Sequence, residues 1–178
     1  YNYLLARENL TDHLEKKNKK NKIRQRLLKI RAKKVILATG ALERPLIFNN
    51  NDRPGIMLSS AIKKYSNFYG VACGTKNIFF TNNDSAYESA LALNNKGLNV
   101  EAIIDIRENS NSRIIKKIND AGIKIYWSHS IVDTTGYKRL SSVSIMKLSN
   151  DGTSVTGSKI SISCDCLGVA GGWTPAVH

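Results

Sequence analysis

The sequence predicts an α/β fold built on a parallel, doubly wound sheet, followed by an antiparallel β-meander. Strands and helices alternate in the order "KNIFFT", a helix over 84–95, "NVEAIIDI", a helix over 112–121, and "IKIYWS". A β-α-β-α-β series at this spacing is typical of a parallel sheet with right-handed crossovers. The next three stretches, "HSIVDTTGY", "RLSSVSIMKL" and "SVTGSKISIS", alternate in polarity between turn signals and predict the meander.

Two further strands are predicted to end in small residues. "KKVILATGA" and "CDCLGVAGG" are continuous apolar runs, typical of central strands that are buried on both faces and end at a ligand. Residues 173–175 are expected to begin a loop or helix, whose free N–H groups would suit an anion. On this pattern alone two interpretations stay open: ordinary strand-to-loop turns, or contact of a cofactor with Ala38, Thr39, Gly40, Gly171, Gly172 and Thr174. The second is favoured only by what the resemblance of this chain to a known family implies.

The first forty residues are expected to form antiparallel strands that close on the buried strand Val35–Leu37. "YNYLLARENL" and "IRQRLLKI" flank a basic turn. The following "ERPLIFNNNDRPG" predicts a loop, because it contains Pro45 and Pro54. From Met57 to Tyr69 apolar residues recur at helical spacing, and Gly70 is expected to end that helix.

Positive charge is concentrated in one segment of the chain. The net charge is +13, and the segment from Lys16 to Lys34 contains many of the 27 Lys and Arg residues and no acidic residue. Such a segment suggests nucleic acid or an anionic surface, but it has neither aromatic residues for stacking on bases nor a helical apolar stripe. We interpret it as a solvated hairpin tip; a docking patch for an acidic partner and a basic nucleic-acid-binding module stay open as alternatives.

A length of 178 residues can hold one domain or parts of two. The chain has no initiator Met and begins in the strand-like "YNYLLA", which suggests an internal fragment of a longer protein. It contains no signal peptide and no apolar run long enough to span a membrane. We therefore expect a cytoplasmic protein without a membrane partner.

The cysteines do not predict a disulfide or a metal site. Cys164 and Cys166 are two residues apart, so on one strand they would point to the same side and could not bridge; Cys73 is distant in sequence. The three histidines are scattered. We expect buried thiols and no bound metal.

No catalytic constellation can be proposed from the spacing of residues, and no catalytic residue is expected. Glu43 and Arg44 are adjacent and are expected to form an ion pair within a loop. Trp127 and Trp173 are expected to be packing residues rather than platforms for a substrate.

The stretch "FFTNNDSAYESALAL" has the strand, turn and helix of a dinucleotide-binding unit but not its glycines. That turn normally reads G-x-G-x-x-G/A, and here Thr81 and Asn83 occupy the glycine positions while only Ala86 fits. A side chain at Asn83 would crowd a pyrophosphate. We expect a structural Rossmann-like unit that binds no dinucleotide, in which Asn83, Asp84 and Ser85 cap the helix and Asp105 keeps the place of an acid that bonds a ribose.

Three stretches carry a resemblance to a known family. "RAKKVILATGALERPLIFNNNDRPGIMLSSAIKKY", "NIFFTNNDSAY" and "GGWTPAVH", in this order, resemble the alpha subunits of heterotetrameric sarcosine oxidases, flavoproteins with two dinucleotide-binding domains. The resemblance implies a second domain inserted into part of a first FAD/NAD-type domain. The expected boundaries are 1–48 in the first domain, 49–74 as a connecting loop and helix, 75–163 as the inserted domain with its meander, and 164–178 as the return to the first domain.

The resemblance also implies a function. The chain would be the NAD-binding segment of an alpha subunit, with beta, gamma and delta partners, FAD and FMN on the partner subunit, and tetrahydrofolate bound by a C-terminal domain. The assembly would oxidatively demethylate sarcosine to glycine with tetrahydrofolate and O2, giving hydrogen peroxide. The alternative is an FAD-binding subunit of a related amine or imino acid dehydrogenase that oxidises proline or opines.

Overall fold

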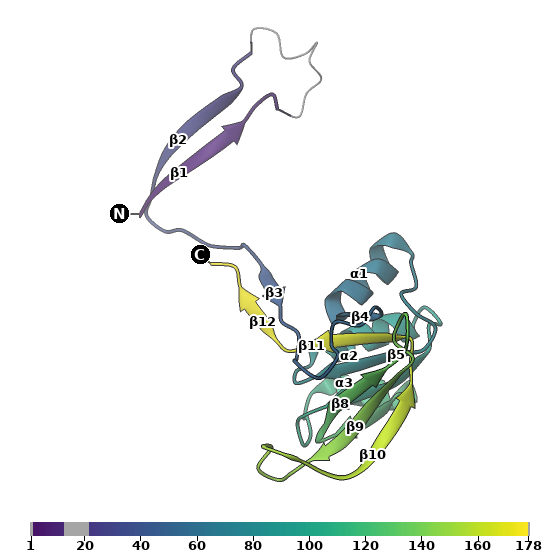
Figure 1. Cartoon of the computed structure of the whole chain (residues 1–178). Helices are drawn as coiled ribbons and strands as arrows, with labels where there is room; N and C mark the ends of the chain where they lie inside the picture. The colour runs from purple at the N-terminus through teal and green to yellow at the C-terminus, as the bar shows by residue number, and fades with distance from the viewer. Residues whose placement is uncertain (1, 13–21, 178) are drawn as a thin grey trace. The chain divides into compact units, whose positions relative to one another are not determined.

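The computed structural model of the chain describes residues 2–12 and 22–177 (Figure 1). It divides into two compact units, one that runs up to Gly40 and one that spans Ala41–Ala176. The expected tip of the basic hairpin falls largely on residues 13–21, which lie outside the described residues, and so it stays a prediction.

The first unit contains an antiparallel hairpin. Strand β1 (Asn2–Asn9) pairs with β2 (Gln25–Ala32) in a register that joins Asn2 to Ala32 and Asn9 to Gln25. The antiparallel pairing predicted for this part of the chain is therefore confirmed.

The predicted buried strand over Val35–Leu37 is wrong. Residues 34–40 have no regular secondary structure, and Ile36 and Leu37 are 91% and 62% exposed. A central parallel strand needs hydrogen-bonded neighbours on both edges and a layer on each face. The part of the chain that the structure describes supplies no strand to pair with this segment, so its apolar residues stay exposed.

The second unit is built on a five-stranded parallel sheet with the order β4-β11-β5-β6-β7. The predicted β-α-β-α-β series is confirmed, and Gly70 ends the first helix in the left-handed conformation, at φ 66°. The strands and helices are β4 (Ile56–Leu58), α1 (Ser59–Tyr69), β5 (Asn77–Thr81), α2 (Ser85–Asn94), β6 (Val100–Asp105), α3 (Arg113–Asp120), β7 (Lys124–Trp127) and β11 (Cys166–Ala170).

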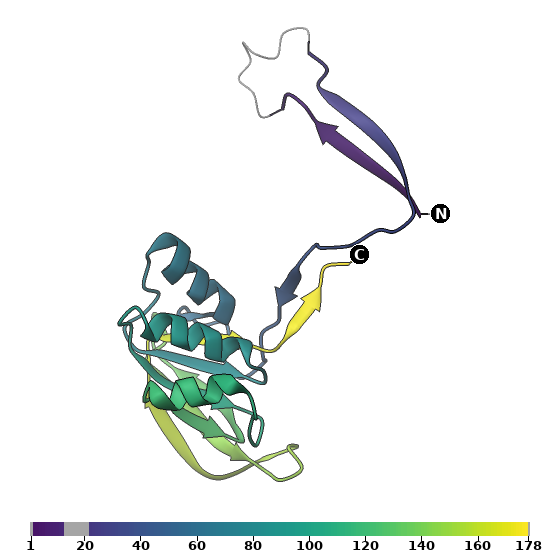
Figure 2. The same cartoon turned by 180° about the vertical axis from the view of Figure 1, so that it is seen from behind.

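The three helices lie on one face of this sheet, and the predicted meander covers the other (Figures 1 and 2). The meander consists of β8 (His129–Thr135), β9 (Ser142–Leu148) and β10 (Val155–Ser163). From β4 to β5, β6 and β7 the chain moves in one direction, so right-handed crossovers place every helix on the same face. Along β5 the side chains alternate: Phe79 packs toward the helices, and Ile78 and Phe80 toward the meander.

Strand β11 is the central neighbour of two other strands in the five-stranded sheet. It lies between β4 and β5, with Val169 opposite both Leu58 and Phe80. The crossover through α1 leaves a space one strand wide between β4 and β5, and the fully buried run Cys166–Ala170 fills it. The second unit also includes residues 41–74, which were expected in the first domain and the connecting segment; the domain boundaries themselves stay a prediction.

The two cysteines near β11 point to opposite faces of the parallel sheet, so the prediction that they share a side is wrong. Cys164 packs in the core on the meander side and Cys166 in the core on the helix side. The reason is that the chain leaves β10 and enters β11 at Asp165, between them. The thiols of Cys164 and Cys166 are buried, as predicted, and burial raises the pKa of each to about 12. Cys73 is only half-buried, so the prediction of a buried thiol is wrong for this residue.

Asp165 holds the turn that precedes β5. Its Oδ1 accepts hydrogen bonds from the N–H groups of Thr75 (2.9 Å) and Lys76 (2.8 Å), and its Oδ2 accepts one from the Thr75 hydroxyl (2.7 Å). Partial burial raises the pKa of this carboxyl, but the hydrogen bonds from Lys76 and Thr75 lower it by more, so the net shift is downward.

We expect Asp165 to contribute to the loss of stability in acid. Because its folded-state pKa lies below the unfolded value, its stabilisation is present above about pH 4 and is lost as the pH falls through the folded pKa. Between pH 6 and pH 3 the melting temperature of Asp165→Asn should fall less than that of the unsubstituted protein. At pH 6 the substitution should lower the free energy of unfolding by about 1 kcal/mol or less, because solvent screens the site. Thermal unfolding of the full-length polypeptide checks this. Asp120→Asn, an exposed position in α3, is the control; an unchanged acid limb in Asp165→Asn would contradict the assignment.

Candidate functional site

The carboxyl ends of β5, β6 and β11 meet at one edge of the parallel sheet. Thr81 is in register with both Asp105 and Ala170, so the last residues of the three strands lie side by side. In open α/β sheets, ligands bind outside this edge, where helix N-termini also gather. This edge is the place where the geometry can be compared with a dinucleotide site.

Asn83 fills the turn after β5 with its own side chain. Its Oδ1 accepts hydrogen bonds from the N–H (3.0 Å) and the hydroxyl (2.6 Å) of Ser85, and its Nδ2 donates to the carbonyl of Ala170 (3.1 Å). The first N–H of α2 is therefore satisfied by Asn83, which confirms the predicted cap for this residue. Asp84, at the N-cap position, makes no side-chain cap.

Asp105 is fully buried at the end of β6 and is bonded by protein groups alone. Its Oδ2 accepts hydrogen bonds from the Tyr87 hydroxyl (2.7 Å) and from Nη2 of Arg107 (2.7 Å), and its Oδ1 accepts one from the Arg107 N–H (2.9 Å). The same Nη2 lies 2.8 Å from Asp84. Asp105 therefore lies at the predicted place, beside Thr81 at the end of β6, but Tyr87 and Arg107 cover its carboxylate and leave no access for a ribose hydroxyl.

The contacts of this network shift the pKa values of Arg107, Asp84 and Tyr87. The side-chain hydrogen bonds that Arg107 donates to Asp105 raise the pKa of Arg107 by more than burial lowers it. Burial raises the pKa of Asp84, but the bonds from Arg107 and neighbouring serines lower it by more. Burial and the neighbouring Asp105 raise the pKa of the Tyr87 phenol. None of these three groups is set to exchange a proton near neutral pH, so the network fixes positions and does not perform acid–base chemistry.

Gly171 is required by the path of the chain itself. A Cβ at this position would lie 2.9 Å from the carbonyl oxygens of both Arg44 and Pro45, and the Gly171 N–H donates to the Arg44 carbonyl. Gly172 differs, because it has a φ of +104° and a Cβ there would meet no described atom within 4 Å. The backbone of Gly172 is therefore open to a close approach by another group.

Residues 173–175 do not begin a helix. They form β12 (Trp173–Pro175), which pairs antiparallel with β3 (Ala41–Glu43) and places Thr174 opposite Leu42. The expectation of a loop or helix start that offers free N–H groups is wrong, since this segment is drawn into a ladder with the residues that follow Gly40.

The six residues predicted to contact a cofactor divide between the two units. Ala38, Thr39 and Gly40 belong to the first unit, and Gly171, Gly172 and Thr174 to the second. Gly40 shares the open character of Gly172, with a φ of +78° and no described atom within 4 Å of a Cβ. Their contact with a cofactor stays a prediction.

Two predictions about side chains near this edge need correction. Glu43 and Arg44 form no ion pair in the described structure; instead the Glu43 carboxylate accepts a hydrogen bond from the Ser60 N–H at the start of α1 (2.8 Å). Trp127 packs against Tyr87 as predicted, with ring centroids 6.2 Å apart. Trp173 is 47% exposed, with Nε1 3.3 Å from the Ser85 hydroxyl, so it is not a buried packing residue.

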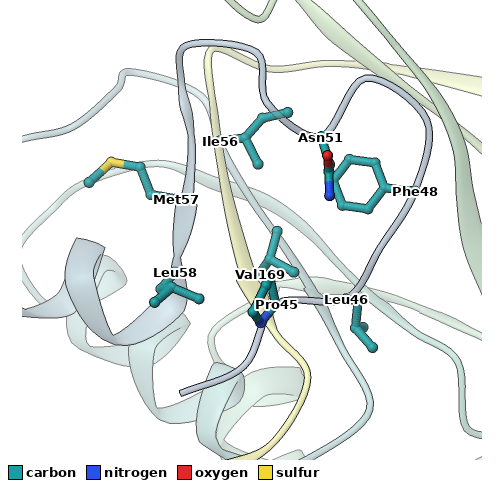
Figure 3. Close-up of a pocket in the computed structure, with 8 residues that line it drawn as sticks. All are labelled: Pro45, Leu46, Phe48, Asn51, Ile56, Met57, Leu58 and Val169. Carbon is teal, nitrogen blue, oxygen red and sulfur yellow. The ribbon is translucent and has the colours of Figure 1, made fainter. Parts of the chain in front are cut away.

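The loop between β3 and β4 forms an apolar pocket that the sequence did not predict (Figure 3). The pocket has a volume of about 240 Å³ and is lined by Phe48, Ile56 and Val169, with Asn51 as a polar neighbour. Sequence reasoning treated this segment as a connection because of its prolines. The apolar "PLIF" after Arg44 was the available signal, since solvated loops seldom carry such a run.

Polar contacts with the meander hold this loop in place. Arg53 donates to the carbonyls of Gly136 and Thr134. The side-chain amides of Asn49 and Asn50 donate to Asp133, at 3.3 and 3.1 Å. The "NNNDRPG" segment thus fixes the wall of the pocket against β8.

Two features are absent from the residues that the structure describes. Across 2–12 and 22–177, no helix is both long and apolar enough to cross a membrane. Over the same residues, no three His, Cys, Asp or Glu side chains gather where they could hold a metal ion.

Solved structures define the class of fold. The chain superposes on thioredoxin reductase from T. acidophilum with a TM-score of 0.60 and 18% identity, over 78% of this chain and 43% of that one. A ferredoxin reductase from Rhodopseudomonas palustris gives a TM-score of 0.56 and 18% identity, over 79% of this chain and 34% of that one. The chain therefore has the Rossmann-like α/β fold found in these oxidoreductases, as predicted.

Curated sequences narrow the relationship, while no family model matches the chain. It is 39% identical over 179 residues to sarcosine oxidase subunit alpha of Corynebacterium sp. (strain P-1), covering 99% of this chain and 18% of that subunit. It is 38% identical over 154 residues to the alpha subunit of Rhizobium meliloti (strain 1021), covering 86% of this chain and 14% of that subunit. The chain is thus related to a segment of sarcosine oxidase alpha subunits, which confirms the resemblance seen in the sequence.

Proposed function

We propose that this chain is the dinucleotide-binding segment of the alpha subunit of a sarcosine-oxidising oxidoreductase, and that the dinucleotide is NAD. The observation that carries the proposal is the 39% identity that extends over 99% of the chain. A flavin or nicotinamide dinucleotide is supported more broadly by the fold, since one structural neighbour is an FAD-dependent pyridine nucleotide-disulphide oxidoreductase from Desulfovibrio vulgaris, at a TM-score of 0.56.

We assign the cofactor contact to residues other than the turn that follows β5. A pyrophosphate at that edge would need the space that Asn83 fills and the N–H that Asn83 already bonds. The residues that fit a cofactor are Gly40 and Gly172, because the backbone is open at both, together with Ala38, Thr39 and Thr174. Gly171 differs from these residues. The close approach of the Arg44 and Pro45 carbonyls requires a glycine at this position even without a ligand.

In the proposed assembly this segment holds NAD and does not transfer hydride itself. Demethylation of sarcosine to glycine, with tetrahydrofolate and O2, would take place on FAD and FMN in a beta subunit, with gamma and delta subunits completing the enzyme. The ion pair between the buried Asp105 and Arg107 supports a scaffold role for the second unit, because protein groups already occupy the Asp105 carboxylate.

The test is to identify the nucleotide released from the full-length polypeptide that contains this chain. The polypeptide is purified alone and with its neighbouring subunits, then denatured, and the released nucleotide is identified by mass and absorbance. NAD from the polypeptide alone, with flavin only when the partners are present, is the expected result. FAD from the polypeptide alone would favour the amine or imino acid dehydrogenase, and no nucleotide would refute cofactor binding.

Gly172→Trp is expected to reduce the NAD content of that polypeptide at least about tenfold, because an indole would occupy the space left to the cofactor. Gly152→Trp is the matched control. Gly152 also has a positive φ, +68°, and no described atom within 4 Å of a Cβ, so both variants place an indole on an open backbone of positive φ. Equal NAD content in the two variants, measured as above, would exclude Gly172 from the site.

A further inference from the structure

The helices α1, α2 and α3 lie side by side on one face of the sheet (Figure 2). A groove crosses the outer face of this helical layer. It has a volume of about 380 Å³. Leu91 and Ala92 of α2 form its floor, and Lys63 of α1 and Ile114 of α3 lie at its sides. The groove lies wholly within the second unit and is separate from the carboxyl edge of the sheet.

The outer face of helix α2 carries Leu91 and Ala92 beside a single charged residue, Glu88. On its inner side Ala86, Tyr87, Ala90 and Leu93 are buried, while on the outer side Leu91 and Ala92 are only half-buried. A helix that faces solvent normally carries polar residues there, and a helix that is apolar on nearly all sides is normally covered. The outer face of α2 is thus a surface that another element is expected to cover.

The edges of the groove are positively charged. Lys63 forms an ion pair with Glu88 at 3.2 Å, so these two charges offset one another. Arg113 and Lys117 lie one turn apart on α3, are both exposed, and have no ion pair in the part of the chain that the structure describes. An apolar floor beside two uncompensated cations is complementary to a surface that is apolar and acidic.

We propose that this groove binds an acidic amphipathic helix of a partner subunit. Apolar side chains spaced one turn apart on that helix would enter over Leu91, Ala92 and Ile114, and Asp or Glu beside them would pair with Arg113 and Lys117. A second copy of this chain does not fit the groove. Its net charge of +13 and its own basic groove would be repelled by the positive charges of Arg113 and Lys117. The inference rests on the proposed function in one respect, that the full-length polypeptide has partner subunits.

The test uses the full-length polypeptide and two labelled synthetic helical peptides as probes. Both peptides carry Leu at positions i, i+4 and i+7; one has Glu at the flanking positions and the other has Lys. By fluorescence anisotropy we expect the Glu peptide to bind more tightly than the Lys peptide, and Arg113→Glu with Lys117→Glu to weaken the Glu peptide roughly tenfold and reverse the preference. Binding of the Glu peptide that is unchanged by this reversal would overturn the proposal.

Two controls separate the groove from general charge effects. Lys138→Glu with Lys147→Glu makes the same change of net charge at exposed positions on the meander side and should leave both peptides unaffected. Leu91→Gln should weaken the Glu peptide while Leu91→Met preserves its binding, with circular dichroism verifying that each variant folds. If the groove were covered by the polypeptide itself, neither peptide would bind and the proposal of a partner would fail.

Release of NAD from the same variants distinguishes this inference from the proposed function. The charge reversal on α3 should leave the nucleotide content unchanged, because none of the residues proposed to hold NAD lines the groove. A polypeptide that binds the Glu peptide but releases no nucleotide would support the proposed groove and refute the proposed cofactor binding. A polypeptide that releases NAD but does not bind the Glu peptide would refute only the proposed groove.

Discussion

Arg107→Met is expected to lower the free energy of unfolding by about 3 kcal/mol or more, since it leaves the buried carboxylate of Asp105 without its cation. The guanidinium donates hydrogen bonds to Asp105 through Nε and Nη2, and it also lies 2.8 Å from Asp84. Its removal therefore leaves the carboxylates of Asp84 and Asp105 without the cation that they share. Urea unfolding of the full-length polypeptide, followed by circular dichroism, measures the change.

Two variants test whether buried charge is the cause. Arg113→Met removes an exposed arginine that has no ion pair in the described structure and should cost less than about 0.5 kcal/mol. Asp105→Asn combined with Arg107→Met removes the unpaired charge and should recover part of the loss. If Arg107→Met were as mild as Arg113→Met, the network would not be a structural element of this edge.

The sequence predicted that the turn after β5 cannot bind a pyrophosphate, but it did not predict the hydrogen-bond network around Asp105. Thr81 and Asn83 in place of two glycines indicated from the sequence that a pyrophosphate could not approach, and the cap by Asn83 follows from the chemistry of an amide before a helix. The cover over Asp105 depends on Tyr87, from the next helix, and on Arg107, beyond the end of the strand. Sequence spacing does not tell which of these side chains meet.

The alternating strands and helices of the second unit were predictable because their signals are local. Apolar residues recur with a period of two in the strands and of 3.6 in the helices. Gly70 follows the end of α1, and Gly97 lies just after the end of α2. Strand neighbours depend on tertiary structure instead. "VILATG" and "LGVAGG" carry the same apolar pattern, yet Cys166–Ala170 is inserted between two strands while Val35–Leu37 is exposed. Periodicity predicts that a segment can be a buried strand and does not supply the partners that bury it.

Gly168→Ala is expected to destabilise the core by about 1–3 kcal/mol through overpacking. Gly168 lies in β11, and a Cβ there would come within 2.6 Å of two ring carbons of Phe79 and 3.1 Å of the Ile62 side chain. Phe79 and Ile62 are almost fully buried, so neither can move away without disturbing the helix side of the core. Thermal and urea unfolding of the full-length polypeptide give the size of the loss.

A second substitution separates this clash from other effects of replacing a glycine. Phe79→Leu alone removes part of a buried ring and is destabilising, since it leaves a cavity. In the double variant, the new methyl group of Gly168→Ala enters that space, so the two losses should add up to more than the loss in the double variant. Strict additivity would mean that the cost at Gly168 comes from the backbone rather than from the Phe79 ring. The expected coupling would identify the small residue in β11 as the feature that allows this strand to pack beneath α1 and beside β5.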